Sequence, residues 1–129
     1  MDAAQALADL TEISSQIEAA AFFDASGKAV ASTLGDEARA DELVRTAAQL
    51  LEAASELPAE APLTQLEVAT HEGSVFVVVD GDRRIVATTG PNPTVGLVFY
   101  DLKSALRAVE PARKPRRRTP KQEATGDAA

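Results

Sequence analysis

The chain has 129 residues, a length that suits one domain and is too short for two ordinary ones. It contains no cysteine and a single histidine, His71, which excludes disulfides, thiolate chemistry and multi-histidine metal sites. No apolar run reaches the roughly 18 residues needed to span a bilayer, and no secretory signal opens the chain, so we expect a cytoplasmic protein. The net charge is −7; residues 111–129 carry +4, which leaves −11 for the remainder.

The first third predicts a helix followed by a β-hairpin. Leu7, Leu10, Ile13 and Ile17 repeat at roughly helical spacing, so we expect a helix from Ala3 to about Gln16, with Asp2 as its N-cap. Segments 18–24 and 28–34 then resemble two strands joined by a tight turn at Gly27.

The middle of the chain predicts a long amphipathic helix from Glu37 to Leu57. Asp36 is a good N-cap, and Pro58 and Pro62 end the pattern. One face is apolar, and the opposite face carries polar and charged side chains. The apolar face holds Ala40, Leu43, Val44, Ala47, Leu51 and Ala54, with Ala48 and Leu50 on its shoulders.

The last third predicts three strands and a helix. Segments 63–71, 74–80 and 84–88 are separated by turns too short for anything but antiparallel neighbours. Asn92 followed by Pro93 is typical of a helix start, and apolar residues then repeat to Glu110. The order α-β-β-α-β-β-β-α predicts an α+β domain at 1–110. We expect a five-stranded antiparallel sheet with the middle helix on one face and the two terminal helices on the other.

Catalytic and metal-binding motifs are missing. His71 lies where a strand meets a turn, and Asp80 and Asp82 flank Gly81 in a pattern that a tight turn explains. An acid/base pair such as Glu67 and Glu72 is the remaining enzymatic alternative, and nothing in its spacing supports it. We therefore expect no enzyme, no metal, no cofactor and no small-molecule substrate.

Two surfaces are candidates for binding a partner. If segment 63–71 is an edge strand, its unpaired backbone groups suit pairing with a second copy of the chain. The residues of this dimer edge are Gln65, Leu66, Glu67, Val68 and Ala69. Such pairing would set two middle helices side by side, as a platform formed by Glu42, Arg45, Gln49, Glu52 and Glu56.

The C-terminal residues 111–129 are basic and have no large apolar side chain, so we expect a disordered tail. Its cations suit an anionic surface, either membrane or nucleic acid, and the alternative is a solubilising end. Thr119 is a candidate phosphorylation site that would reduce the charge. The basic residues are Arg113, Lys114, Arg116, Arg117, Arg118 and Lys121.

Residues 3–110 as a whole resemble the roadblock/dynein light chain family, with its profilin-like architecture. The stretch LADLTEISSQIEAAAFFDASGKAVAST is similar to the family's first helix and hairpin, and EVATHEGSVFVVVDGDRRIVATTGPNPTVGLVFYDLKSALRAV to its closing strands and last helix. The basic tail has no counterpart in the family pattern.

The resemblance implies a homodimer with a continuous sheet and paired middle helices. It also implies a role without catalysis, as a scaffold or regulator of a small Ras-like GTPase, and the Ala- and Arg-rich composition favours a prokaryotic member. The alternative is a dimeric sensory or structural adaptor whose basic tail docks to membrane or nucleic acid.

Overall fold

The computed structural model describes residues 1–109; the basic tail predicted at 111–129 lies outside the described residues. The predicted element order and the α+β class are confirmed. The elements are α1 (Ala3–Ile13), β1 (Ile17–Asp24), β2 (Ala29–Ser32), α2 (Glu37–Ala54), β3 (Gln65–Ala69), β4 (Ser74–Asp80), β5 (Arg83–Thr89) and α3 (Val95–Ala108).

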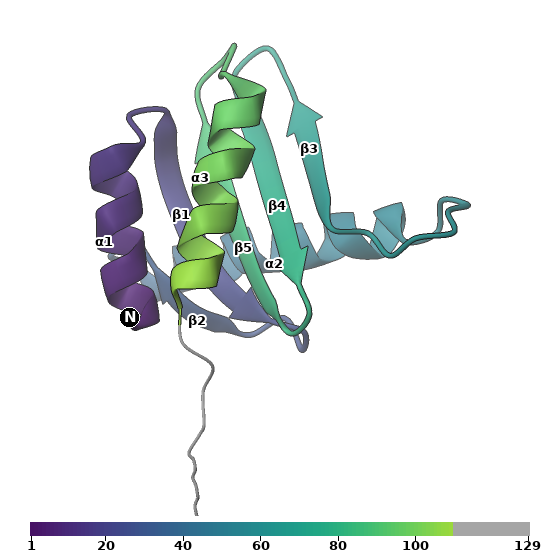
Figure 1. Cartoon of the computed structure of the whole chain (residues 1–129), viewed down its shortest axis with the longest axis horizontal. Helices are drawn as coiled ribbons and strands as arrows, with labels where there is room; N and C mark the ends of the chain where they lie inside the picture. Colours follow the sequence, from purple (N-terminus) through teal and green to yellow (C-terminus); the bar gives the residue numbers. More distant parts are fainter. Residues whose placement is uncertain (110–129) are drawn as a thin grey trace, which may run out of the picture.

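All five strands form one antiparallel sheet in the order β2-β1-β5-β4-β3. The β1–β2 hairpin and the β3–β4–β5 meander form one sheet because β1 pairs with β5, with Ala21 opposite Val86. The first strand of the meander therefore lies at one edge of the sheet and β2 lies at the other (Figure 1).

The helices cover the sheet as predicted. In Figure 1 α1 and α3 lie side by side in front of the sheet, and α2 lies behind it. Successive residues of a strand point to opposite faces, so Phe22 packs under α1 and α3 while Phe23 packs under α2. On the α1/α3 face the largest buried side chains include Phe76, Ile85, Leu102 and Leu106, and on the α2 face they include Val44, Val77 and Val86.

Two helices end earlier than their apolar spacing predicts. The first helix ends at Ile13, where the backbone of Ser14 becomes extended, and the Ile13 side chain is 72% exposed. Ile17 belongs to β1 and packs into the core from there, so the predicted four-residue apolar stripe spans a break in the helix. The middle helix ends at Ala54, and residues 55–57 form a turn.

The predicted start of the last helix is wrong. Asn92 has a positive φ of 58° and lies before the helix, and Thr94 is the N-cap. The Thr94 side chain makes no capping hydrogen bond; instead its backbone N–H donates to Gln16 Oε1 at 2.6 Å. An N-cap residue needs an extended backbone, which a residue in the left-handed region cannot supply.

Asp24 organises the hairpin turn between β1 and β2. Its Oδ1 accepts hydrogen bonds from the Ser26 hydroxyl at 2.6 Å, the Ser26 N–H at 3.0 Å and the Lys28 N–H at 3.1 Å. These bonds, the Ser26 hydroxyl first, favour the ionised carboxylate and lower the pKa of Asp24. Gly27 follows with a φ of +84°, which few other residues adopt.

Candidate protein interface

The edge strand β3 presents an unpaired side to solvent. It bonds to β4 only, with Leu66 opposite Val77 and Val68 opposite Val75. Because Val77 belongs to the core under α2, Leu66 and Val68 also point to the α2 face of the sheet. Glu67 lies opposite Phe76 and points to the other face. The free N–H and C=O groups along this strand can receive a further strand.

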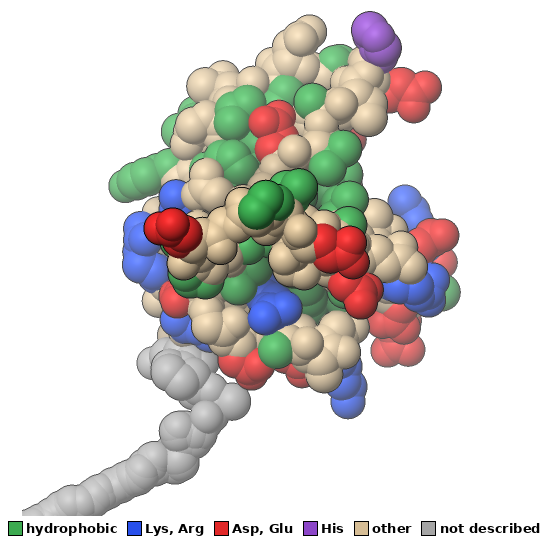
Figure 2. All heavy atoms as spheres, turned by 90° about the vertical axis from the view of Figure 1, so that its right-hand side faces the viewer, with side chains coloured by type: hydrophobic (Ala, Val, Ile, Leu, Met, Phe, Trp, Pro, Cys, Tyr) green, Lys and Arg blue, Asp and Glu red, His purple; other side chains and the backbone are tan. Residues whose placement is uncertain are grey.

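The middle helix leaves part of the sheet uncovered beside this edge. It packs against β1, β2 and β5, so the α2 face of β3 and β4 is incompletely covered. Val68 is 38% exposed, and several neighbouring apolar side chains are half-buried. This apolar strip consists of Leu43, Leu50, Leu66, Val68 and Val75. Figure 2, which faces the β3 edge, shows hydrophobic side chains between the strand and the charged surface of α2.

A shallow hollow joins α2 to this strip. It has a volume of about 310 Å³ and is lined by Leu43 and Thr46 of α2, by Thr88 of β5 and by four further residues. Thr88 lies opposite Val75 on β4, which in turn lies opposite Val68 on β3. The hollow and the strip therefore follow one row of residues across the sheet to its edge.

The predicted platform on α2 is exposed throughout. Glu42, Arg45, Gln49 and Glu52 lie on the outer side of the helix, within an arc of about 80° at 3.6 residues per turn. Glu56 is also exposed, but it lies in the turn after Ala54 and not on the helix. Within residues 1–109 none of these charged groups forms an ion pair, so their charges are available to a partner.

Two clefts border the platform. Arg45 lines a cleft of about 850 Å³ between α2 and β2, together with Glu37, Asp41 and Lys28. Glu52 lines a second cleft of about 380 Å³ at the end of α2. Both clefts are wide open and mixed in charge, which suits a protein surface better than a small molecule.

Arg84 is a candidate site residue that the sequence analysis missed. It lies opposite Phe23 and Val79 in the sheet and lines the cleft that holds Glu52. Its Nε is buried and has no acceptor in the described part of the chain. The sequence signal was the pair of adjacent arginines at the start of a strand, because neighbouring strand residues must point to opposite faces.

The residues considered for catalysis remain ordinary surface groups. His71 is exposed at the tip of the β3–β4 turn (Figure 2), as are Glu67 and Glu72 nearby in the chain. Asp80 forms an ion pair with Arg83 at 3.2 Å. In residues 1–109 no group of three or more histidines and carboxylates is placed to hold a metal ion. None of the three described helices is long and apolar enough to cross a membrane.

Solved structures share this arrangement. A Roadblock/LC7 domain from Streptomyces avermitilis superposes with a TM-score of 0.74 at 14% identity, covering 84% of this chain and 94% of that one. The chain has the Roadblock/LC7 fold. Two further structures with this fold match at a TM-score of 0.69: MglB from Myxococcus xanthus, at 16% identity over 81% of this chain and 89% of that one, and the gliding protein MglB from Thermus thermophilus, at 17% identity over 83% and 84%. No protein-family model and no curated protein matches the sequence.

Proposed function

We propose that the protein is a dimeric, non-enzymatic regulator or scaffold of a small Ras-like GTPase in the cytoplasm. The observation that carries the proposal is the apolar strip beside an open sheet edge, in a chain with the Roadblock/LC7 fold. The similarity to two bacterial MglB structures supports a prokaryotic regulator of this kind.

Dimerisation would proceed through β3. Two copies related by a twofold axis would pair their β3 strands antiparallel and form one continuous sheet. The same operation would bring each apolar strip against the α2 helix of the other copy and remove it from water. One MglB structure is described as a tetrameric arrangement, which supports self-association for this fold.

The GTPase would bind the paired α2 helices. Three of the five platform residues are acidic, and Arg45 is the only cation among them. We expect the partner to present a basic surface, because opposite charges speed encounter and select against wrong partners. Without a catalytic group of its own, the platform would act by holding the GTPase in one conformation or at one place.

Sedimentation equilibrium tests the dimer. The wild-type chain should show twice its 13.5 kDa mass at tens of micromolar, and Val68→Asp should show the single mass. The matched control is Val30→Asp on the opposite edge strand β2, where Val30 is 60% exposed; it should leave the dimer intact. A wild-type chain that sediments as a monomer at these concentrations would contradict the dimer.

Binding and turnover assays test the partner. Each Ras-like GTPase encoded in the same genome is loaded with GDP or GTP and titrated with the protein, and its GTP hydrolysis is followed. Glu42→Lys combined with Glu52→Lys should weaken binding at least tenfold, whereas Glu72→Lys at the β3–β4 turn should not. If no such GTPase binds or changes its turnover, the proposed function fails.

A further inference from the structure

A continuous groove runs along the flank of α2 that faces β2. It consists of the two clefts beside the platform, of about 850 Å³ and 380 Å³, which share the residues Ser26, Gly27 and Ala48. The other wall is β2 and, beyond the hairpin turn, Val79 and Arg84. The groove residues of α2 fall within an arc of about 80° at 3.6 residues per turn. They are Glu37, Asp41, Arg45, Ala48 and Glu52. We call this the α2–β2 groove.

The groove is open at the edge of the sheet. Where the two clefts meet, the wall residues are small, and a Cβ added to Gly27 would lie 3.9 Å from the Ala48 Cβ. β2 pairs with β1 only, so backbone N–H and C=O groups along its outer side can receive a further strand. Because β3 forms the opposite edge, the proposed dimer would leave this groove uncovered.

The two ends of the groove differ in chemistry. At the end near Gly35, Glu37 and Asp41 lie about one turn apart, and neither forms an ion pair within residues 1–109. At the other end Leu63 and Val79 are half-buried against the core under α2 and leave apolar surface in the groove. A complementary partner therefore carries a cation for the first end and a large apolar side chain for the second.

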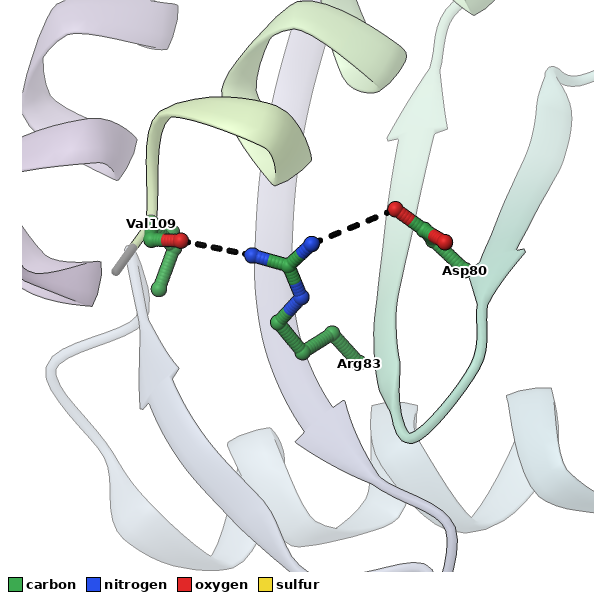
Figure 3. A network of polar contacts seen from close by, with 3 residues as sticks. All are labelled: Asp80, Arg83 and Val109. Atoms are coloured by element: carbon green, nitrogen blue, oxygen red, sulfur yellow. Dashed lines mark hydrogen bonds and ion pairs between the residues drawn. The ribbon is translucent and has the colours of Figure 1, made fainter. Parts of the chain in front are cut away.

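Arg84 adds a hydrogen-bond donor at the apolar end. Its Nε is buried, and its side chain has no hydrogen-bond or ion-pair partner among the described residues. The neighbouring Arg83 has two partners: Nη1 donates to the Val109 carbonyl oxygen at 2.6 Å, and Nη2 contacts Asp80 Oδ2 at 3.2 Å (Figure 3). Because a buried donor without an acceptor is unfavourable, the Arg84 Nε suits an acceptor that a partner brings.

We propose that the α2–β2 groove binds an extended segment of another protein, in which a basic residue is followed by a large apolar one. The segment would add to β2 as an antiparallel strand, the arrangement of every pair in this sheet. Its cation would lie against Glu37 and Asp41. Its apolar side chain would pack on Leu63 and Val79, and a backbone carbonyl beside it would accept from Arg84 Nε.

The order and spacing of the two residues follow from the geometry. β2 runs toward Gly35, so an antiparallel segment enters at the acidic end and its basic residue comes first. From Asp41 to Leu51 the helix rises by about 15 Å, which is the length of four or five extended residues. Asp24 and Glu52 also line the apolar end, so a neutral carbonyl fits Arg84 better there than a further carboxylate.

Peptide arrays probed with the full chain test the inference. The array holds eight-residue peptides of serine and threonine in which one arginine and one leucine are placed at every spacing and in both orders. Binding should be strongest when arginine precedes leucine by four or five positions. It should be weak in the reversed order and when glutamate replaces arginine. Fluorescence anisotropy then gives the dissociation constant of the best peptide.

Three variants test the ends and the middle of the groove. Asp41→Lys should weaken binding about tenfold and favour the peptide with glutamate in place of arginine. Arg84→Met keeps an apolar stem but lacks the donor, and should weaken binding about fivefold. Ala48→Phe should block the groove where the two clefts meet. Matched controls at exposed positions outside the groove should bind as the wild type does. They are Glu12→Lys, Arg39→Met and Ala53→Phe.

Three results would overturn the inference. The first is an array on which no peptide binds the wild-type chain. The second is peptide binding that both Arg84→Met and Ala48→Phe leave unchanged, which would place the peptide elsewhere on the protein. The third is a sedimenting mass that Asp41→Lys or Ala48→Phe lowers in the absence of peptide, which would assign the groove to a second copy. Circular dichroism of each variant checks the fold. None of these measurements contains a GTPase, so the inference stands or fails independently of the proposed function.

Discussion

The rings of Phe76 on β4 and Phe99 on α3 meet edge to face, with centroids 5.0 Å apart and planes at 78°. Phe76 is fully buried, and Phe99 is partly buried against the same core. This pair attaches α3 to the β4 side of the sheet.

Phe76→Ala should destabilise the protein by about 3–5 kcal/mol, because it removes a fully buried ring and leaves a cavity. Phe99→Leu keeps most of the volume and should cost about 0.5–1.5 kcal/mol, the range for the ring-to-ring contact. Urea unfolding followed by circular dichroism gives both values. Equal costs for the two variants would show that the rings are not packed as described.

Gly73 should tolerate no side chain. A Cβ at this position would lie 2.2 Å from the Thr89 carbonyl oxygen, which belongs to the neighbouring backbone and cannot move away. Gly73→Ala should therefore lower the unfolding midpoint in urea markedly. Gly35→Ala, where a Cβ meets nothing within 4 Å, is the matched control and should have little effect. If both variants unfold at the wild-type midpoint, β4 and β5 do not pair as closely as described.

The Asp24 turn should make stability depend on pH. Because the pKa of Asp24 is lowered by the Ser26 and Lys28 hydrogen bonds, its contribution is fully present above the ordinary value of 3.8. That contribution is lost as the pH falls through the lowered folded-state pKa. Asp24→Asn should thus be less stable than wild type at pH 7, and the difference should shrink below about pH 4.

Urea unfolding midpoints between pH 2 and pH 7 measure this difference. Asp41→Asn provides the comparison, because Asp41 is exposed on α2 and makes no side-chain hydrogen bond among the described residues. A gap between wild type and Asp24→Asn that stays constant across this range would contradict the proposed role of the carboxylate.

The N-caps of α2 and α3 should contribute differently to stability. Asp36 accepts a hydrogen bond from the Ala38 N–H at 2.9 Å, so Asp36→Ala should cost about 1 kcal/mol. Thr94 occupies the same position on α3 without a side-chain capping bond, so Thr94→Ala should cost clearly less. Thermal unfolding of the two variants, compared with wild type, separates them. A larger loss for Thr94→Ala would mean that its hydroxyl caps α3 in solution.

Most of the fold was predictable because helix caps and tight turns, which depend only on neighbouring residues, determine the helix starts and the strand neighbours. Asp2 and Asp36 precede helical patterns, and both cap their helices in the structure. The turns at Gly27 and Gly81 are short, so they determined which strands are consecutive neighbours. The pairing of β1 with β5 was not predictable in this way, because no short turn connects these strands.

The candidate interface was only partly predictable. Along β3, apolar residues alternate with polar ones, which indicated one apolar and one polar side. The structure shows this arrangement. Leu43 and Leu50 were assigned to the core and its shoulder, because a helical pattern gives the angle of a residue and not the position of the helix over the sheet. The lateral placement of α2 over β1, β2 and β5 leaves both side chains half-buried at the border of the core. The predicted start of α3 was wrong for another reason. Asn92 adopts the left-handed conformation that a turn needs, which asparagine tolerates better than most residues.

The incomplete cover of β3 and β4 has a thermodynamic consequence. A strip that meets water in a single chain and is hidden in a pair couples folding to mass action, so the melting temperature of the proposed dimer should rise with protein concentration. Dilution would then separate the two β3 strands. The rate of protease cleavage in the loop before β3 would report how often the dimer dissociates.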